Sequence, residues 1–148
     1  MTAFAVSDSL EDRQAVVDVT IAYCWALDTR DWDALDEVFL ADATASLGSE
    51  LIGLEAIKER VTDALKPLDH SQHVVSNHQV RVDGDVATSR CYFVAQHTVA
   101  GTEGGPNFIV AGRYEDALLR TAAGWRIRRR ELSVTWTDGN PKVLYRRS

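Results

Sequence analysis

Residues 73–82, HVVSNHQVRV, and residues 86–99, VATSRCYFVAQHTV, are joined by Asp83, Gly84 and Asp85. Apolar and polar side chains alternate along both segments, and a period of two is typical of β-strands. The Asp-Gly-Asp sequence between them is a tight-turn signal. We therefore expect the two segments to form an antiparallel hairpin.

Two further alternating segments follow at residues 108–119 and 125–137. A Gly-rich loop at residues 101–106 precedes the first, and Ala122-Ala123-Gly124 forms a turn between them. The second half of the chain is thus predicted to be a meander of four antiparallel strands. The tail after Gly139 carries no such pattern and is expected to be loosely ordered.

The first half has the longer period of helices. Residues 10–28 place Leu10, Val17, Ile21, Cys24 and Asp28 on one predicted face. Residues 31–39 and 54–65 are also predicted helices, with residues 43–52 weakly strand-like between them. Helices followed by an antiparallel sheet define an α+β domain with the helices packed over one face of the sheet.

The 148 residues are 45% hydrophobic and 26% charged, with a formal charge of −6. These values describe one soluble globular domain spanning residues 1–148. No apolar run reaches the length of a membrane span, and the acidic balance argues against nucleic acid as a partner. Cys24 and Cys91 lie in apolar stretches as free thiols, so a cytoplasmic location is expected.

The strand pattern indicates which residues face the helices. In residues 86–99 the apolar face holds Ala87, Cys91, Phe93, Ala95, His97 and Val99. His97 is therefore expected to face the enclosed side of the sheet. For residues 73–82 the alternation does not decide which set of alternate side chains faces inward, the set that includes His73 or the set that includes His78.

Four residues are candidates for chemistry: Tyr23, Asp28, His73 and His97. In a functional reading, Asp28 orients the His73 imidazole and stabilises its protonated form, which makes the histidine a better base. Tyr23 then supplies an O–H donor to a developing oxyanion. In the alternative reading, Asp28 only ends the first helix and the histidines are ordinary core or surface groups. The spacing leaves both readings open, and Tyr23 and Asp28 can border one cavity only if the helix ends near Asp28.

The segments YCWALDTRDWDAL at residues 23–35, FLADA at 39–43, SQHVVSN at 71–77 and GWRI at 124–127 resemble the SnoaL-like family of the nuclear transport factor 2-like superfamily. This resemblance implies a cone-shaped barrel of a strongly bent antiparallel sheet, wrapped around three N-terminal helices and enclosing an apolar pocket. It also implies a homodimer or homotrimer.

Within that superfamily the chain is most similar to scytalone dehydratase, bile-acid 7α-dehydratase and hexachlorocyclohexane dehydrochlorinase, which work without metal or cofactor. Their Asp–His pair matches Asp28 and His73, Tyr23 matches a tyrosine of the bile-acid enzyme, and His97 matches a second histidine of scytalone dehydratase. The chain also departs from these relatives. It has Val110 where scytalone dehydratase has an asparagine, and Thr135 where the other two enzymes have an arginine. Ketosteroid isomerase, another member of the superfamily, has a carboxylate base at the position that falls near Leu47 here. The resemblance therefore does not carry over the substrates of these enzymes.

The resemblance implies a cofactor-independent lyase of the dehydratase kind, or an isomerase, acting on a small and largely apolar cyclic, polyketide-like or steroid-like molecule. The expected pocket lining is Trp25, Leu27, Asn77, Phe93, Phe108 and Trp136. The same fold also serves as a non-catalytic ligand-binding or assembly domain, and a SnoaL-type polyketide cyclase would use similar residues. Sequence alone does not separate these functions.

Two other groups of residues are weaker signals. His70, His73 and His78 lack a carboxylate or thiolate partner at a sensible spacing, so no metal site is predicted. Arg126, Arg128, Arg129 and Arg130 form a local basic cluster that alternates between strand faces. We expect this cluster to lie on a solvated sheet face or at a subunit interface.

Overall fold

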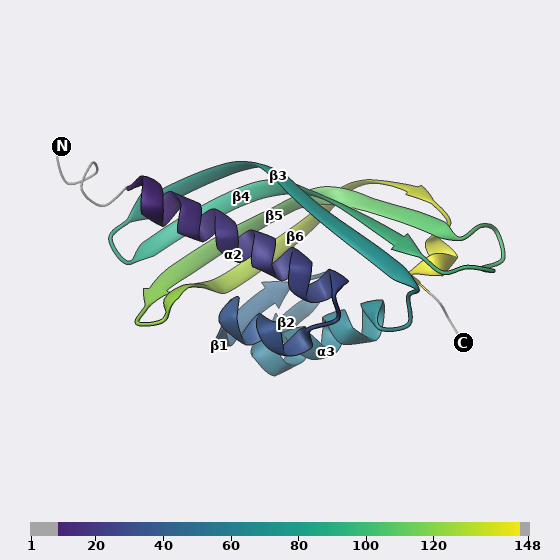
Figure 1. Ribbon diagram of the computed structural model, residues 1–148, viewed down its shortest axis with the longest axis horizontal. Helices are drawn as coiled ribbons and strands as arrows, with labels where there is room; N and C mark the ends of the chain where they lie inside the picture. Colours follow the sequence, from purple (N-terminus) through teal and green to yellow (C-terminus); the bar gives the residue numbers. More distant parts are fainter. Residues whose placement is uncertain (1–8, 146–148) are drawn as a thin grey trace.

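The structure is a computed structural model and describes residues 9–145. Figure 1 shows a sheet with the helices gathered on one side of it. The elements in chain order are α2 (Leu10–Asp28), η1 (Trp32–Glu37), β1 (Phe39–Ser46), β2 (Glu50–Ile52), α3 (Leu54–Leu65), β3 (His70–Asp83), β4 (Val86–Thr98), β5 (Asn107–Thr121), β6 (Gly124–Gly139) and η2 (Pro141–Val143). The predicted α+β class is confirmed.

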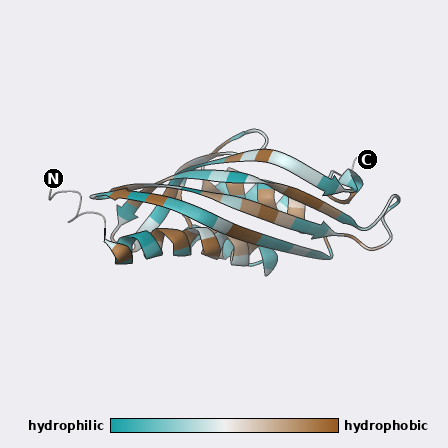
Figure 2. Ribbon diagram, turned by 90° about the horizontal axis from the view of Figure 1, so that it is seen from above, coloured by the Kyte–Doolittle hydropathy of each residue, from teal (hydrophilic) through white to brown (hydrophobic). Residues whose placement is uncertain are grey.

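The six strands form one curved sheet in the order β2-β1-β6-β5-β4-β3. The four long strands are the predicted antiparallel meander, and Asp83 pairs with Val86 across the predicted turn. β1 joins the sheet alongside β6 in the parallel direction, which the sequence did not indicate. The sheet is not closed: β2 and β3 lie at its two edges, so the barrel is an open cone. α2 crosses the enclosed face diagonally, and the edge-on view in Figure 2 shows it lying along that face.

Local hydrogen bonds define both ends of helix α2. The Ser9 side chain accepts a hydrogen bond from the Asp12 backbone N–H at 3.0 Å, which caps the first turn. At the other end Arg30 has a left-handed backbone (φ 62°), and the Asp31 N–H donates to the Ala26 carbonyl. The helix therefore ends at Asp28, as a site shared by Tyr23 and Asp28 requires.

The buried face of α2 differs from the predicted one. Leu10 is 84% exposed and Ile21 is 37% exposed, whereas Val16 and Leu27 are buried. Apolar residues lie on more than one side of this helix, so the period alone does not select a face. The sheet selects the side that carries Tyr23.

Three other segment predictions need correction. In place of the helix predicted at residues 31–39 there is only a short 3-10 helix at Trp32–Glu37, and Phe39 already belongs to β1. The weak strand at residues 43–52 is two strands joined by a turn. The segment after Gly139 is also ordered through residue 145, with Asn140 capping η2 and Val143 fully buried. Burying an apolar side chain offsets the entropy lost on ordering a chain end.

Two strands change the face that they present because of bulges. β3 shifts register between Ser76 and Gln79, where Asn77 has a left-handed backbone (φ 59°). β6 shifts register twice against β5, at the positions opposite the Ala117/Leu118 and Ala111/Gly112 steps. An extra residue in a strand turns the following side chains to the other face. This is why simple alternation did not settle the orientation of residues 73–82.

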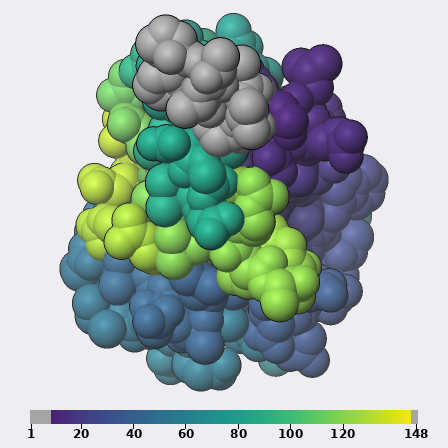
Figure 3. All heavy atoms as spheres, turned by 90° about the vertical axis from the view of Figure 1, so that its left-hand side faces the viewer, coloured from purple at the N-terminus to yellow at the C-terminus, as the bar shows by residue number. Residues whose placement is uncertain are grey.

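At the end of the cone that holds the start of α2 and the β3–β4 and β5–β6 turns, Arg120 on β5 connects the strands to the helix. Its guanidinium forms an ion pair with Asp12 at 2.8 Å and with Asp85 at 3.1 Å, and it stacks 4.6 Å from the Trp125 ring centroid. Figure 3 views this end and shows the start of α2 beside the two hairpin turns. The long strands are thus fixed to α2 at this end.

Candidate active site

A cavity of about 340 Å³ lies between α2, α3 and the enclosed face of the sheet. Its opening is marked by exposed residues of the lining, Gly48, Val134 and Tyr145. The remaining lining residues are mostly apolar or aromatic: Tyr23, Leu27, Leu47, Arg60, Val61, Ala64, Leu65, His73, Phe93, Ala95, His97, Val110, Tyr114, Leu132 and Leu144. An apolar cavity with a few converging polar groups is typical of a small-molecule site.

Asp28 and His73 meet at the wall of this cavity. The His73 Nδ1 atom lies 2.7 Å from Asp28 Oδ1, and the His73 backbone N–H donates to Asp28 Oδ2 at 2.7 Å. The imidazole side chain is only 6% exposed. Since a carboxylate accepts hydrogen bonds, Nδ1 carries the hydrogen and Nε2 keeps its lone pair. His73 is also one of the residues that line the cavity.

The Asp28 carboxylate is held by a second contact. The Ser71 hydroxyl donates to Asp28 Oδ1 at 2.9 Å, and Arg30 Nη1 in turn donates to the Ser71 oxygen at 2.9 Å. Burial raises the pKa of the Asp28 carboxyl, but the hydrogen bonds from His73 and Ser71 outweigh it and leave the pKa below its ordinary value. Asp28 is therefore ionised at neutral pH and able to stabilise a protonated His73.

His97 lies on β4 beside His73, with the ring centroids 6.1 Å apart. Its Nδ1 donates to the Phe108 backbone carbonyl at 3.0 Å, which leaves Nε2 unprotonated. Burial lowers the pKa of His97 from 6.5 to about 4, although the bond to Phe108 opposes the shift. His97 is thus neutral at pH 7, and its Nε2 atom is able to accept a hydrogen bond.

Tyr23 and Tyr114 line the buried part of the cavity, with Arg130 between them. The Arg130 Cζ atom lies 4.4 Å from the Tyr23 ring centroid and 3.9 Å from that of Tyr114. Two guanidinium nitrogens bond to Asp116, each at 2.8 Å, and both side chains of this pair are fully buried. Burial raises the pKa of Tyr23, and the nearby Arg130 charge only partly opposes the shift. Tyr23 therefore keeps its hydroxyl proton at neutral pH.

The burial of Arg130 contradicts the prediction for the basic cluster. Arg130 follows the first bulge of β6 and so faces the core, whereas Arg128 is exposed. Arg129 forms a bidentate pair with Glu50 on β2. The cluster is therefore divided between the core and the sheet surface.

The structure brings together some predicted site residues and not others. Tyr23, Leu27, His73, Phe93 and His97 line the cavity, with Asp28 directly behind His73. Trp25, Asn77, Phe108 and Trp136, which were also expected to line it, are not among the residues around this cavity. Trp25 is 67% exposed on the outer side of α2, and Trp136 is 51% exposed after the second β6 bulge. Asn77 is exposed at the β3 bulge. Phe108 is buried, its carbonyl accepts the hydrogen bond from His97, and its ring centroid lies 5.7 Å from that of Tyr145.

Several residues of the site, either around the cavity or bonded to Asp28, were not predicted from the sequence. Tyr114 shares the inward parity of β5 with Phe108 and Val110, so the alternation contained that signal. Ser71 shares the parity of His73, two residues away. Arg60, Leu144 and Tyr145 had no sequence signal, because their positions depend on how α3 and the C-terminal segment pack over the opening.

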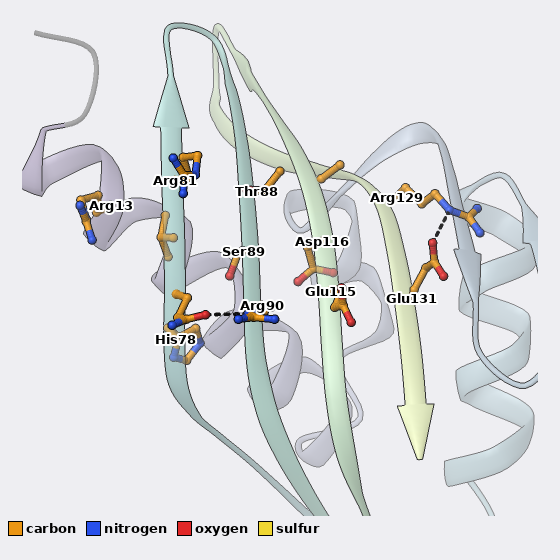
Figure 4. A pocket seen from close by; sticks show the side chains of 13 residues that line it. Arg13, His78, Arg81, Thr88, Ser89, Arg90, Glu115, Asp116, Arg129 and Glu131 are labelled. Atoms are coloured by element: carbon orange, nitrogen blue, oxygen red, sulfur yellow. Dashed lines mark hydrogen bonds and ion pairs between the residues drawn. The ribbon is translucent and has the colours of Figure 1, made fainter. Parts of the chain in front are cut away.

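A second, larger hollow of about 700 Å³ lies over strands β3 to β6 and is lined by charged side chains (Figure 4). Arg90 donates to Gln79 at 2.6 Å, and Arg129 lies 3.5 Å from Glu131. The Asp116 carboxylate is bound to buried Arg130. These contacts describe a polar and charged surface hollow, whereas the smaller cavity is largely apolar with a few converging polar groups and is the stronger candidate for chemistry.

Within residues 9–145, no three or more His, Cys, Asp or Glu side chains are grouped so that they could hold a metal ion. None of the helices in this range is long and apolar enough to cross a membrane. Cys24 and Cys91 are both buried and free.

Comparison with known proteins identifies the family. The SnoaL-like domain matches residues 8–131. An uncharacterized protein of Mycobacterium tuberculosis (strain ATCC 25618 / H37Rv) is 36% identical over 130 residues, which is 84% of each chain. The chain belongs to the SnoaL-like family, as its sequence motifs predicted.

Solved structures share the fold. One is a candidate aromatic ring hydroxylase from Novosphingobium aromaticivorans, with a TM-score of 0.81 and 30% identity over 92% of this chain and 98% of the other. Another is a hexachlorocyclohexane dehydrochlorinase, with a TM-score of 0.77 and 16% identity over 88% and 90% of the two chains. The dehydrochlorinase likeness shows the fold alone, and enzymes therefore occur among the proteins of this fold.

Proposed function

We propose that this protein is a cofactor-independent acid-base lyase of the dehydratase kind, acting on a small and largely apolar molecule. His73 is the base, and Asp28 orients it and stabilises its protonated form. Tyr23 stabilises the developing oxyanion, and His97 accepts a hydrogen bond from the substrate. The Asp28–His73 contact carries this proposal. A ligand carrier has no need of an ionised carboxylate at 2.7 Å from an imidazole that lines the cavity.

The proposed reaction balances without any further reagent. The His73 Nε2 atom takes a proton from the carbon next to a carbonyl group, and the electron pair forms an enolate whose oxygen accepts a hydrogen bond from the Tyr23 hydroxyl. The enolate then re-forms the carbonyl, the bond to a β-hydroxyl group breaks, and the protonated His73 returns its proton to the leaving oxygen. The products are a conjugated alkene and water.

The tautomers assign different roles to the two histidines. His97 has no proton on Nε2 and a pKa of about 4, so at neutral pH it accepts a hydrogen bond and does not act as the acid. In our proposal it receives the β-hydroxyl hydrogen and so aligns the leaving group. Alignment of reacting groups lowers the entropic part of a barrier.

Proton abstraction is testable before the natural substrate is identified. The exchange of α-hydrogens of 2-tetralone for deuterium in D₂O, followed by NMR, measures the base directly. We expect His73→Ala to slow the catalysed exchange by about 10²–10⁴-fold. The matched control is His70→Ala, which removes an exposed histidine from the same strand.

Elimination is a separate measurement. Formation of cyclohexenone from 3-hydroxycyclohexanone is followed by the absorbance of the conjugated product. Exchange that continues at the wild-type rate in His73→Ala contradicts the assignment of the base. Exchange without elimination, across a panel of cyclic β-hydroxyketones, favours an isomerase over a lyase.

The expected homodimer or homotrimer stays a prediction. Tyr92, Val94 and Trp136 are 54%, 39% and 51% exposed. We propose that this outer face of the sheet is where copies of the chain meet, since exposed apolar patches often mark interfaces.

A further inference from the structure

Arg60 on α3 differs from every other residue that the structure places around the cavity. Among the cavity residues in the range 9–145, it is the only Lys, Arg, Asp or Glu. It is half-buried and lies near Gly48, one of the exposed residues that mark the opening. A permanent positive charge therefore stands at the entrance of an otherwise apolar cavity.

The charge of Arg60 is not neutralised by the described part of the chain. Nη1 donates to the Ser49 hydroxyl at 2.7 Å, and Nη2 donates to the Leu47 carbonyl, both of which are uncharged. No ion pair joins Arg60 to a carboxylate within residues 9–145. A guanidinium has five N–H donors, so these two contacts leave others without a partner. On the same helix, by contrast, Lys58 pairs with Asp36 at 2.6 Å.

The turn between β1 and β2 leaves room for this guanidinium. Gly48 has a left-handed backbone (φ 87°), and a Cβ atom at this position would lie 2.8 Å from Arg60 Nη2. A side chain there would press on the arginine. The turn thus holds the guanidinium in one place through the Ser49 and Leu47 contacts, which reduces the ordering that ligand binding would cost.

We propose that Arg60 binds an anionic group of the substrate, a carboxylate or a comparable oxyanion, at the opening of the cavity. The apolar body of the molecule then extends past Val61 and Leu65 toward His73. The planar guanidinium suits an oxyanion because it offers parallel N–H donors, and partial burial strengthens the attraction. This inference rests on the proposed function in naming the substrate class of the same cavity: an apolar carbonyl compound with an acidic group at one end.

The test uses two fluorescent probes that differ in one charged group. 8-Anilinonaphthalene-1-sulfonate carries a sulfonate on an apolar body, and N-phenyl-1-naphthylamine is the same body without it. We expect the wild-type protein to prefer the sulfonate. Arg60→Met should weaken sulfonate binding by about tenfold or more and leave the Kd of the neutral probe unchanged. Arg60→Lys, which keeps the charge but loses the planar donors, should have an intermediate effect.

Two control variants define where the anion binds. Arg113→Met removes one positive charge from the outer face of β5 and should change neither Kd. Ala64→Trp fills part of the cavity and should weaken both probes. Circular dichroism checks that each variant is folded.

Three results would overturn the proposal. Equal weakening of both probes by Arg60→Met assigns the arginine a purely structural role in the β1–β2 turn. An unchanged sulfonate Kd in Arg60→Met excludes it as the anion ligand. Unaltered sulfonate binding in Ala64→Trp places the anion outside this cavity. The two proposals can fail separately, because the base is His73 and the anion ligand is Arg60. A wild-type protein that prefers the sulfonate probe but does not catalyse α-hydrogen exchange would refute the proposed reaction and leave the anion subsite standing.

Discussion

His73 and Asp28 are 45 residues apart in the chain, yet the His73 side-chain and backbone nitrogens both bond to the Asp28 carboxylate, each at 2.7 Å. The backbone bond fixes the carboxylate relative to strand β3, and the side-chain bond fixes the imidazole relative to the carboxylate. The ring is thereby held in the orientation that places Nδ1 against the carboxylate. Helix α2 ends at Asp28, and Arg30, two residues further on, donates to the Ser71 hydroxyl oxygen of β3.

Replacing Asp28 with Asn should slow the catalysed exchange of α-hydrogens by about 10- to 1,000-fold, because the protonated His73 loses a charged partner. The fold should survive, since the amide keeps the size of the carboxyl. The experiment measures 2-tetralone exchange by NMR, with Asp42→Asn as a control for loss of an exposed carboxylate. Equal rates in Asp28→Asn and the wild type would mean that the carboxylate plays no part in the chemistry.

Removing the buried cation should destabilise the fold strongly. Arg130→Met leaves the Asp116 carboxylate buried without its partner, and we expect a loss of about 3–5 kcal/mol in the free energy of unfolding. The double variant Arg130→Met with Asp116→Leu should recover much of that loss, because it removes both buried charges. Urea denaturation measures the difference, and Arg128→Met, an exposed change on the same strand, should cost little. A double variant no more stable than Arg130→Met would contradict the electrostatic explanation.

Stability should fall as the pH is lowered from about 6.5 to about 4, because of His97. Its pKa is about 4 in the folded protein and 6.5 ordinarily, so the unfolded chain takes up the proton first. The stabilisation is complete above pH 6.5 and is lost as the pH falls toward 4, by up to about 3 kcal/mol. The pKa of His78 is also lowered by burial, so it adds to the same trend.

His97→Asn isolates the His97 contribution. Its unfolding free energy, measured in urea at several pH values, should depend less on pH between 6.5 and 4 than that of the wild type. His70→Asn, at an exposed position, should keep the wild-type slope. Identical slopes in His97→Asn and the wild type would show that His97 titrates normally in the folded state.

Local patterns were sufficient for much of the fold. The alternation in residues 86–99 predicted the inward face of β4, including Phe93 and His97, because this strand runs without a bulge. The helix at Leu54–Leu65 was predicted at its observed bounds, since its apolar residues repeat at helical spacing before Pro67. The family motifs named Asp28 and His73 as partners, which the spacing alone left open.

Bulges limited the same reasoning elsewhere. Asn77 shifts β3 from the parity of His73 to that of His78, so both histidines face inward and His78 bonds to Thr20 at 2.8 Å. In β6 the first bulge turns Arg130 into the core, and the second turns Trp136 out of it. A single extra residue reverses the alternation, and no local pattern in these strands revealed where it falls.

The sequence by itself determined the two long helices, the four long strands, their order and the Asp28–His73 pair, because side-chain periodicity, turn residues and family motifs are properties of short segments. Tertiary structure alone decided the parallel contact of β1 with β6, the burial of Arg130 between Tyr23 and Tyr114, and the place of Arg60 at the cavity opening. Those features depend on packing between segments that are distant in the chain. Such packing is selected by the total burial of apolar surface and the pairing of buried charges, which no single segment encodes.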